Sequence, residues 1–400
     1  MAPIPRLRDY SGPAILSYGF RPFFLIGSVY AGLAILLWLA MLTGSLDLPT
    51  VFSPLDWHVH EMLYGFLPAV ITGFLLTAIP NWTGRLPLQG RPLLGLVLAW
   101  MAGRVAVSVS AWIGWLPAAS IDVAFLLLVA AVVAREIIAG KNWRNLKVLG
   151  VLVALSIGNA VFHIEAHGGG ADLGVRLGIG AMVLLVLLIG GRIVPSFTRN
   201  WLVRENPGRL PAPYDRMDTV AMAAAGGALA LWIAVPDHRA TGAALIAGGL
   251  VQAVRLARWA GDRTLRDPLV LILHLAYAFA PIGFVLVGLS SFGVLPASAG
   301  LHAWTGGALG AMTLAVMSRA SLGHTGRALA ASAALRVVYA LVIVSVLARI
   351  GAAMMPIGTV ELLSVAGLAW AAAFLGFAAS YWAILTGPRR GALAAARAGR

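Results

Sequence analysis

The sequence predicts an all-α fold, a polytopic bundle of transmembrane helices, and three observations support this. Of the 400 residues, 60% are hydrophobic and only 11% are charged, whereas soluble domains are roughly a quarter charged. The apolar residues gather in runs of about twenty, the length that an α-helix needs to cross a bilayer. Basic residues concentrate in alternate loops, as the positive-inside rule expects. We therefore predict a single integral membrane domain over residues 1–400.

About twelve apolar runs follow one another along the chain, joined mostly by short loops that contain Gly, Pro and Asn. They cover residues 23–43, 61–80, 93–113, 118–139, 147–167, 173–191, 217–235, 240–258, 268–290, 301–318, 329–350 and 360–385. No small-residue cleavage site follows the first run, so we interpret it as a retained helix and not as a signal peptide. No soluble domain or convincing internal repeat is readable.

The Lys and Arg residues predict the orientation of the chain. They lie before the first run and after every second run: Arg6, Arg8 and Arg21; Arg85 and Arg91; Arg135, Lys141, Arg144 and Lys147; Arg192, Arg199, Arg204, Arg209 and Arg216; Arg255, Arg258, Arg263 and Arg266; Arg319 and Arg327; Arg389, Arg390, Arg397 and Arg400. The other loops are nearly free of basic residues. Both termini are therefore predicted to be cytoplasmic.

Composition also excludes several classes of function. The formal charge of +14 would suit a nucleic-acid binder, but the basic residues are scattered between apolar runs and form no stripe. We therefore predict membrane lipid and no nucleic acid as partners, and the sequence leaves a protein partner open. The chain has no cysteine, which excludes disulfides, iron–sulfur clusters, blue-copper thiolates and covalently attached haem. Any bound metal must use histidine, carboxylate, methionine or tyrosine.

Histidines gather at the predicted outer ends of three runs. His58 and His60, with Glu61, open the second run; His163 closes the fifth; His302 opens the tenth. A single histidine near a helix end is usually an interfacial hydrogen-bonding residue. Several at one depth on three helices favour a functional site, because ionisable groups inside a membrane are expensive.

Local spacing leaves alternatives open at this outer cluster. His58 and His60 would point to nearly opposite sides of one helix, so either the helix begins between them or they serve different ligands. Asn159 and His163 share a helix face at i,i+4. The amide of Asn159 either orients the imidazole, as groups behind metal ligands do, or forms an interhelical hydrogen bond.

The tenth run carries a stripe of small residues below its histidine. His302, Gly306 and Gly310 fall on one helix face at i, i+4 and i+8. This stripe leaves room for a flat group such as a haem macrocycle, or it forms a face for close helix packing.

A sparser group lies toward the cytoplasmic side. His274 is about six residues inside the ninth run, roughly 9 Å along a helix, and His324 follows the tenth run. Arg192 and Arg319 stand at span ends next to small residues. They could pair with haem propionates or another anionic ligand, although the positive-inside rule alone explains most of these arginines.

Several motifs together resemble the NnrS family. They are "SYGFRPFF" (17–24), "WHVHEMLYGF" (57–66), "NAVFH" (159–163), "GGRIVPSFTRNWL" (190–202) and "LHAWTGGALGAMTLAVMSRASLGHTGR" (301–327). The resemblance covers nearly the whole chain. It implies a multi-pass protein of the bacterial inner membrane that contains haem and copper. It also implies a role in nitric oxide metabolism and resistance to nitrosative stress, alongside denitrification.

With this resemblance, we predict heme b and copper as cofactors. The metal ligands would be His58, His60, His163 and His302, with Glu61 as a proton donor or as a carboxylate behind a ligand. His274 and His324 would ligate a second haem or nothing.

The predicted activity is the binding and reduction of nitric oxide, with quinol as the possible electron donor. The alternatives are a transporter or sensor of haem, copper or an iron–nitrosyl species, or a structural partner in a respiratory complex. Broken helices would favour transport. Pro68, Pro80, Pro195 and Pro281 are candidate breaks, of which Pro80 and Pro195 are expected to end spans.

Overall fold

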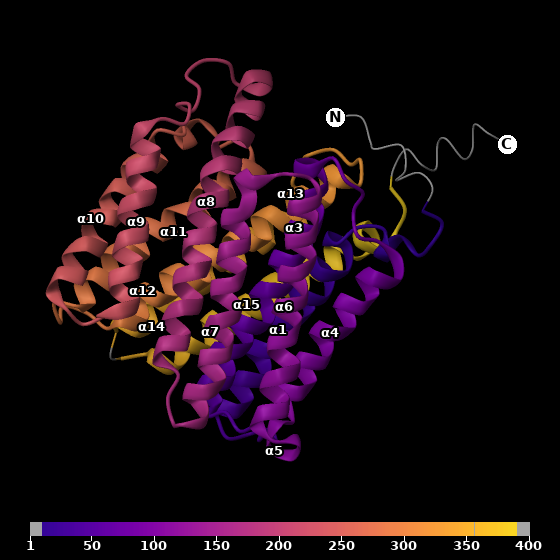
Figure 1. The fold of residues 1–400 in the computed structure, drawn as a ribbon. Helices are drawn as coiled ribbons and strands as arrows, with labels where there is room; N and C mark the ends of the chain where they lie inside the picture. The colour runs from indigo at the N-terminus through magenta and orange to yellow at the C-terminus, as the bar shows by residue number, and fades with distance from the viewer. Residues whose placement is uncertain (1–9, 356, 390–400) are drawn as a thin grey trace. The chain divides into compact units, whose positions relative to one another are not determined.

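The computed structural model describes residues 10–355 and 357–389, and the regular structure in them is helical, without a strand. Figure 1 shows the helices in chain order. Contacts between Cα atoms divide the chain into two compact units, and α8, α13 and α15 each contribute residues to both. Five basic residues used to predict orientation lie outside the described residues: Arg6, Arg8, Arg390, Arg397 and Arg400.

Helices long enough to cross a membrane make up most of the described chain. By length and composition, the described residues contain 11 such helices. The predicted run 301–318 lies in the consecutive elements α12, η6 and α13, which extend from Ala297 to His324. The all-helical, multi-pass character is confirmed, whereas the number of spans and the cytoplasmic termini remain predictions.

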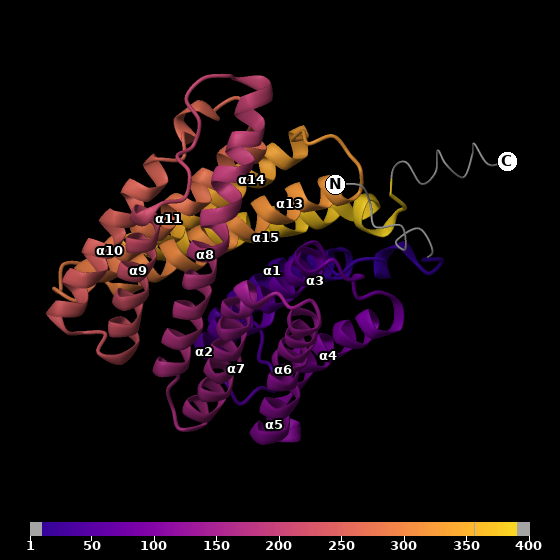
Figure 2. The ribbon, with the colours of Figure 1, turned by 45° about the horizontal axis from the view of Figure 1, so that its top comes forward.

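The first unit consists, within the described residues, of 10–178, 317–329 and 374–389. Its complete helices are α1 (Phe20–Leu42), α2 (Pro54–His60), α3 (Leu67–Thr83), α4 (Gly90–Ser108), α5 (Ser110–Ile113), α6 (Trp115–Ala139) and α7 (Leu146–His167), with short 3₁₀ turns at Ala14–Leu16 and Trp143–Asn145. Between α2 and α3 lies the π-helical segment η3 (Glu61–Phe66). Within this unit α1 packs against α3, and α6 packs against α3, α4 and α7 (Figure 2).

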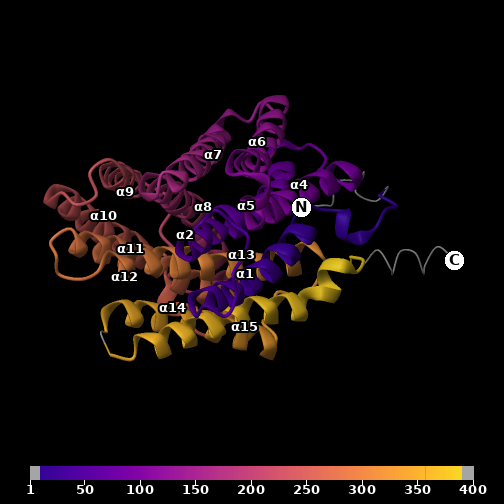
Figure 3. The same cartoon turned by 90° about the horizontal axis from the view of Figure 1, so that it is seen from below.

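The second unit consists of residues 179–316 and 330–373. It takes most of α8 (Asp172–Glu205) and α15 (Thr359–Thr386), the start of α13 (Met312–His324), and the complete helices α9 (Arg216–Ala234), α10 (Arg239–Ala257), α11 (Pro268–Ser290), α12 (Ala297–His302) and α14 (Ala333–Met354), with a 3₁₀ turn at Gly261–Arg263. A second π-helical segment, η6 (Ala303–Ala311), follows α12. In this unit α10 packs against α9 and α11, and η6 packs against α11 and α14 (Figure 3).

Local sequence signals fix several helix ends. Ser53 caps α2, because its Oγ accepts a hydrogen bond from the Asp56 amide at 3.1 Å, and Pro54 occupies the first turn. Asp215 forms a capping box with Asp218 at the start of α9. Gly84 ends α3 in the left-handed conformation, with φ of 70°.

Two predicted helix boundaries are wrong. The second apolar run continues a helix that already begins at Pro54, and α8 extends to Glu205, beyond the predicted end at residue 191. Pro80 and Pro195 lie inside α3 and α8 and do not end them. A membrane helix tolerates an interior proline when neighbouring groups satisfy the freed carbonyl.

Candidate metal centre

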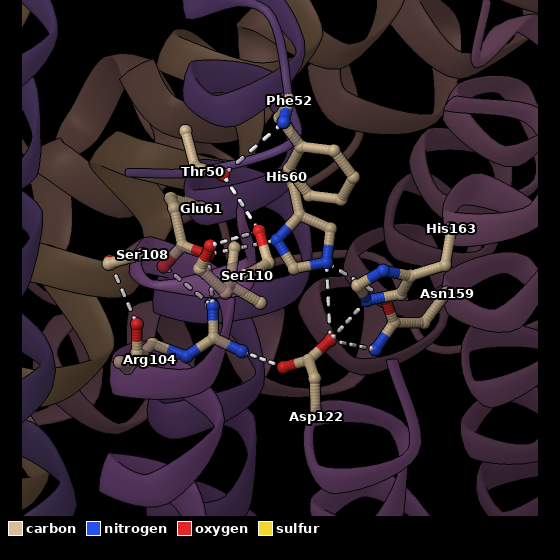
Figure 4. A network of polar contacts seen from close by, with 12 residues as sticks. Thr50, Phe52, His60, Glu61, Arg104, Ser108, Ser110, Asp122, Asn159 and His163 are labelled. Atoms are coloured by element: carbon tan, nitrogen blue, oxygen red, sulfur yellow. Dashed lines mark hydrogen bonds and ion pairs between the residues drawn. The ribbon is translucent and has the colours of Figure 1, made fainter. Parts of the chain in front are cut away.

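A buried polar cluster lies in the first unit, and five parts of this unit supply its side chains (Figure 4). We call it the His60 cluster. Its members come from α1, the α2–η3 junction, α4, α6 and α7: Tyr30, His60, Glu61, Arg104, Asp122, Asn159 and His163.

Arg104 joins the two carboxylates of the cluster. Its Nη1 donates to both oxygens of Glu61 at 2.6 Å, and its Nη2 donates to Oδ1 of Asp122. The hydroxyl of Tyr30 also donates to Glu61. The exposed fractions of Glu61, Asp122 and Arg104 are 0%, 1% and 5%. These are therefore charges held away from water, which are costly unless they are paired.

His60 lies between the two carboxylates. Its Nδ1 is 2.9 Å from Oε1 of Glu61. Its Nε2 is 3.1 Å from Oδ1 of Asn159 and 3.2 Å from Oδ2 of Asp122. Because ionised carboxylates only accept hydrogen bonds, each ring nitrogen needs a positive group in front of it. That group is a proton or, at Nε2, a metal ion.

One oxygen of Asp122 is the meeting point of the cluster. Its Oδ2 accepts a hydrogen bond from Asn159 Nδ2 at 2.8 Å and lies 3.1 Å from Nε2 of His163. One potential ligand atom each from His60, Asp122 and His163 lies within 4.8 Å of the others. Two imidazoles and a carboxylate form a donor set that suits copper and other transition metals.

The hydrogen bond between His60 and Glu61 has the arrangement found behind metal ligands. Metal-bound histidines usually donate their second ring nitrogen to a carboxylate, which fixes the orientation of the ring. Glu61 is held in turn by Arg104 and Tyr30. A carboxylate behind a ligand would have this geometry, and the role of Glu61 stays a prediction.

Aromatic rings enclose the cluster. The ring of Phe52 lies 5.2 Å from that of His60 and 5.3 Å from that of His163, and the ring of Phe162 lies 5.2 Å from His60. Tyr64 packs against His60 at 5.7 Å and donates its hydroxyl to a backbone carbonyl of α8. His60 is 0% exposed and His163 is 3% exposed. Both histidines direct Nε2 at Oδ2 of Asp122, at 3.2 and 3.1 Å, and this close approach suits a small ion and not a haem macrocycle.

The π-helical segment η3 brings Glu61 and a glycine against Arg104. A Cβ atom on Gly65 would lie 2.5 Å from Nη1 of Arg104 and 2.8 Å from Oε2 of Glu61. The carbonyl of Gly65 accepts a hydrogen bond from Nε1 of Trp100 at 2.9 Å. Single π-helical turns are frequent at functional sites, and here a side chain larger than that of glycine would displace Arg104 or Glu61.

His58 lies apart from the cluster. Both His58 and His60 belong to α2, so the interpretation that a helix begins between them is wrong. The ring of His58 stacks on Trp38 at 4.2 Å, on a different side of α2 from the side where His60 faces Asp122 and Asn159. Asn159 forms interhelical hydrogen bonds with His60 and Asp122. An interhelical hydrogen bond was one of the two alternatives expected for this residue.

The stripe below His302 is filled by side chains of the second unit. Nδ1 of His302 is 2.7 Å from the carbonyl of Ser298. A Cβ on Gly310 would lie 2.5 Å from the ring of Trp370, and one on Gly306 would lie 3.4 Å from Val346. Here the glycines serve helix packing, and a haem does not fit on this stripe.

The predicted inner residues fall in both units. In the second unit, His274 has Nε2 2.8 Å from the hydroxyl of Thr198, and Arg192 lies on α8. In the first unit, Arg319 lies on α13, and His324 packs near the rings of Tyr18 and Phe20 at 5.8 and 5.7 Å.

Sequence reasoning missed three members of the cluster: Tyr30, Arg104 and Asp122. The signal was present for two of them. Arg104 and Asp122 are charged residues inside the predicted runs 93–113 and 118–139, where an ionisable side chain usually has a function and a partner. Tyr30 carries no such signal, because tyrosine is common in membrane helices.

The family model for NnrS protein matches residues 14–389, nearly the whole chain. The chain belongs to the NnrS family. Membership suggests a membrane protein of the nitric oxide response, in a family linked to metal binding. A search of curated proteins found no match.

Proposed function

We propose that this NnrS-family chain is a copper-dependent redox protein of a bacterial inner membrane that binds and reduces nitric oxide, with quinol as electron donor. The buried His60–Asp122–His163 set carries the proposal, because a donor set of this kind behind a hydrogen-bonded carboxylate is typical of a transition-metal site.

The residues of the His60 cluster have different roles in this proposal. His60 and His163 supply imidazole nitrogens and Asp122 supplies an oxygen. Glu61 fixes the His60 ring, and Arg104 holds both carboxylates in place. Copper, when bound, supplies one-electron redox chemistry.

The enclosure suits a small uncharged substrate. Nitric oxide is soluble in lipid and can reach a site inside the bilayer without a polar channel. Phe52, Phe162 and Tyr64 exclude water from the His60 ring. In the overall reaction, two nitric oxide molecules and one quinol give one nitrous oxide, one water and one quinone, so that electrons and protons balance.

Haem is not used in this proposal. The rings of His60 and His163 are enclosed, and the stripe of Gly306 and Gly310 is filled by packing. The prediction of heme b therefore remains a prediction.

Turnover of nitric oxide separates reduction from transport or sensing. Purified chain in detergent, supplied with copper and a reduced quinol analogue, should consume nitric oxide at an electrode and release nitrous oxide. His163→Ala should lose this activity. The matched control is His167→Ala, one turn further along α7, where the ring stacks on Trp115 outside the cluster; it should keep the activity. Binding of nitric oxide without consumption by the wild type would instead favour a sensor or transporter.

A further inference from the structure

The His60 cluster is not electroneutral when both imidazoles are neutral. Glu61 and Asp122 each carry a negative charge and Arg104 carries a positive one, so the net charge of the cluster is −1. Glu165 at the end of α7 is not a member of the cluster: its carboxylate accepts hydrogen bonds from the Gly174 and Leu173 amides at the start of α8, at 2.7 and 3.3 Å.

An uncompensated charge at this depth is expensive. The three charged residues are at most 5% exposed, and rings lie beside His60 and His163. In such surroundings a net charge costs several kcal/mol unless a counter-charge lies beside it. The cluster therefore reaches neutrality with a single positive charge at Nε2 of His60, either a proton or a monovalent metal ion that replaces it. A divalent ion there would leave one positive charge over.

We infer that the His60–Asp122–His163 set takes monovalent copper, Cu⁺, in preference to divalent ions, and that Arg104 sets this preference. This inference rests on the proposed function, since it specifies the ion that the same site holds. Imidazole nitrogens suit copper ions, and Cu⁺ is the monovalent ion of that metal.

Arg104 is suited to this role as a positioning residue. It touches both carboxylates, and its Nη2 bonds the oxygen of Asp122 that does not face the histidines. A guanidinium remains charged under all ordinary conditions, so its contribution to the balance is constant. Gly65 lets it approach Glu61 closely, because a Cβ there would collide with Nη1.

Competition between two ions tests the inference on the wild-type chain. Purified full-length protein is loaded anaerobically with Cu⁺ or with Zn²⁺, then titrated with bathocuproine disulfonate for Cu⁺ and a chromogenic chelator for Zn²⁺. We expect the wild type to hold Cu⁺ at least about a hundredfold more tightly than Zn²⁺, since an extra buried charge near Arg104 is repelled. Zinc held as tightly as Cu⁺ would overturn the inference but leave the metal site standing. Retention of neither ion would overturn the proposed function as well.

A compensated pair of variants separates charge from packing. Arg104→Met leaves two negative charges over, so the ratio of Cu⁺ to Zn²⁺ affinity should fall by about a hundredfold. Adding Glu61→Gln to Arg104→Met restores a single negative charge, and the ratio should return toward that of the wild type. A merely structural role for Arg104 would lower both affinities in Arg104→Met, leave the ratio unchanged and show no recovery in the double variant. That result would overturn the inference.

Discussion

At the scale of single residues, buried charges in the first unit satisfy one another. Asp122 accepts from Arg104 and Asn159 and faces both His60 and His163. Such a residue cannot be removed without leaving a partner exposed to an apolar environment. The same cluster is thus the candidate functional site and contributes to the stability of the first unit.

Removal of Asp122 should destabilise the chain strongly. Asp122→Ala leaves Arg104 with one carboxylate in place of two, and breaking a buried pair costs about 3–5 kcal/mol. Thermal unfolding in detergent, followed by circular dichroism, measures the change. Asp262→Ala is the control, because the pair of Asp262 with Arg209 is 66% and 55% exposed and an exposed pair contributes about 1 kcal/mol or less. Equal losses in the two variants would contradict the buried-pair account.

At the scale of elements, the two π-helical segments follow short helices that end in histidine. Here α2 ends at His60 before η3, and α12 ends at His302 before η6. The consequence differs between them. In the first unit the segment places Glu61 and Gly65 against Arg104, whereas the glycines of η6 admit Trp370 and Val346.

Gly65 should be intolerant of even a methyl group. Gly65→Ala forces the added Cβ against Nη1 of Arg104 and Oε2 of Glu61, so we expect displacement of Arg104 and a loss of bound copper of at least about half. Gly95→Ala on α4 is the matched control, since a Cβ there meets nothing within 4 Å. An alanine in an open helical position is neutral or stabilising. Elemental analysis of the purified variants measures their copper content. Full retention of copper in Gly65→Ala would contradict the close packing of Gly65 against Arg104.

The elements also show what sequence can and cannot predict. Apolar runs predict the helices, since their length is set by the bilayer. They do not predict that α2 begins at Pro54 or that α8 continues past Pro195, because those ends depend on capping and on contacts with neighbours. His60 and His163 were predicted together from their depth. Arg104 and Asp122 stand out as charged residues inside apolar runs, but the rotation of each helix cannot be read from such uniform runs, so their pairing with the histidines could not be predicted.

At the scale of the whole molecule, the second unit contains its own buried ion pair but no equivalent metal-ligand set among the described residues. Arg255 donates to Asp218 at 2.9 Å and to the hydroxyl of Tyr277 at 3.0 Å, which joins α9, α10 and α11. These donors and acceptors satisfy one another, so we assign this network to stability.

The predicted orientation is testable because the chain has no cysteine. Single cysteines at exposed positions, Ser45→Cys between α1 and α2 and Tyr214→Cys before α9, should react differently with a membrane-impermeant maleimide on intact cells. The first loop is predicted to be outside and the second inside, so only Ser45→Cys should be labelled, and Tyr214→Cys only after lysis. Labelling in the reverse pattern would invert the topology.

The central claim is that His60, Asp122 and His163 hold copper. The most direct measurement is the copper-to-protein ratio of purified chain reconstituted with Cu⁺, together with copper-edge X-ray absorption to identify the ligands. We predict about one copper per chain with imidazole scattering, lost in His60→Ala and His163→Ala and kept in His167→Ala. Full copper content with an unchanged absorption spectrum in both cluster variants would contradict the claim.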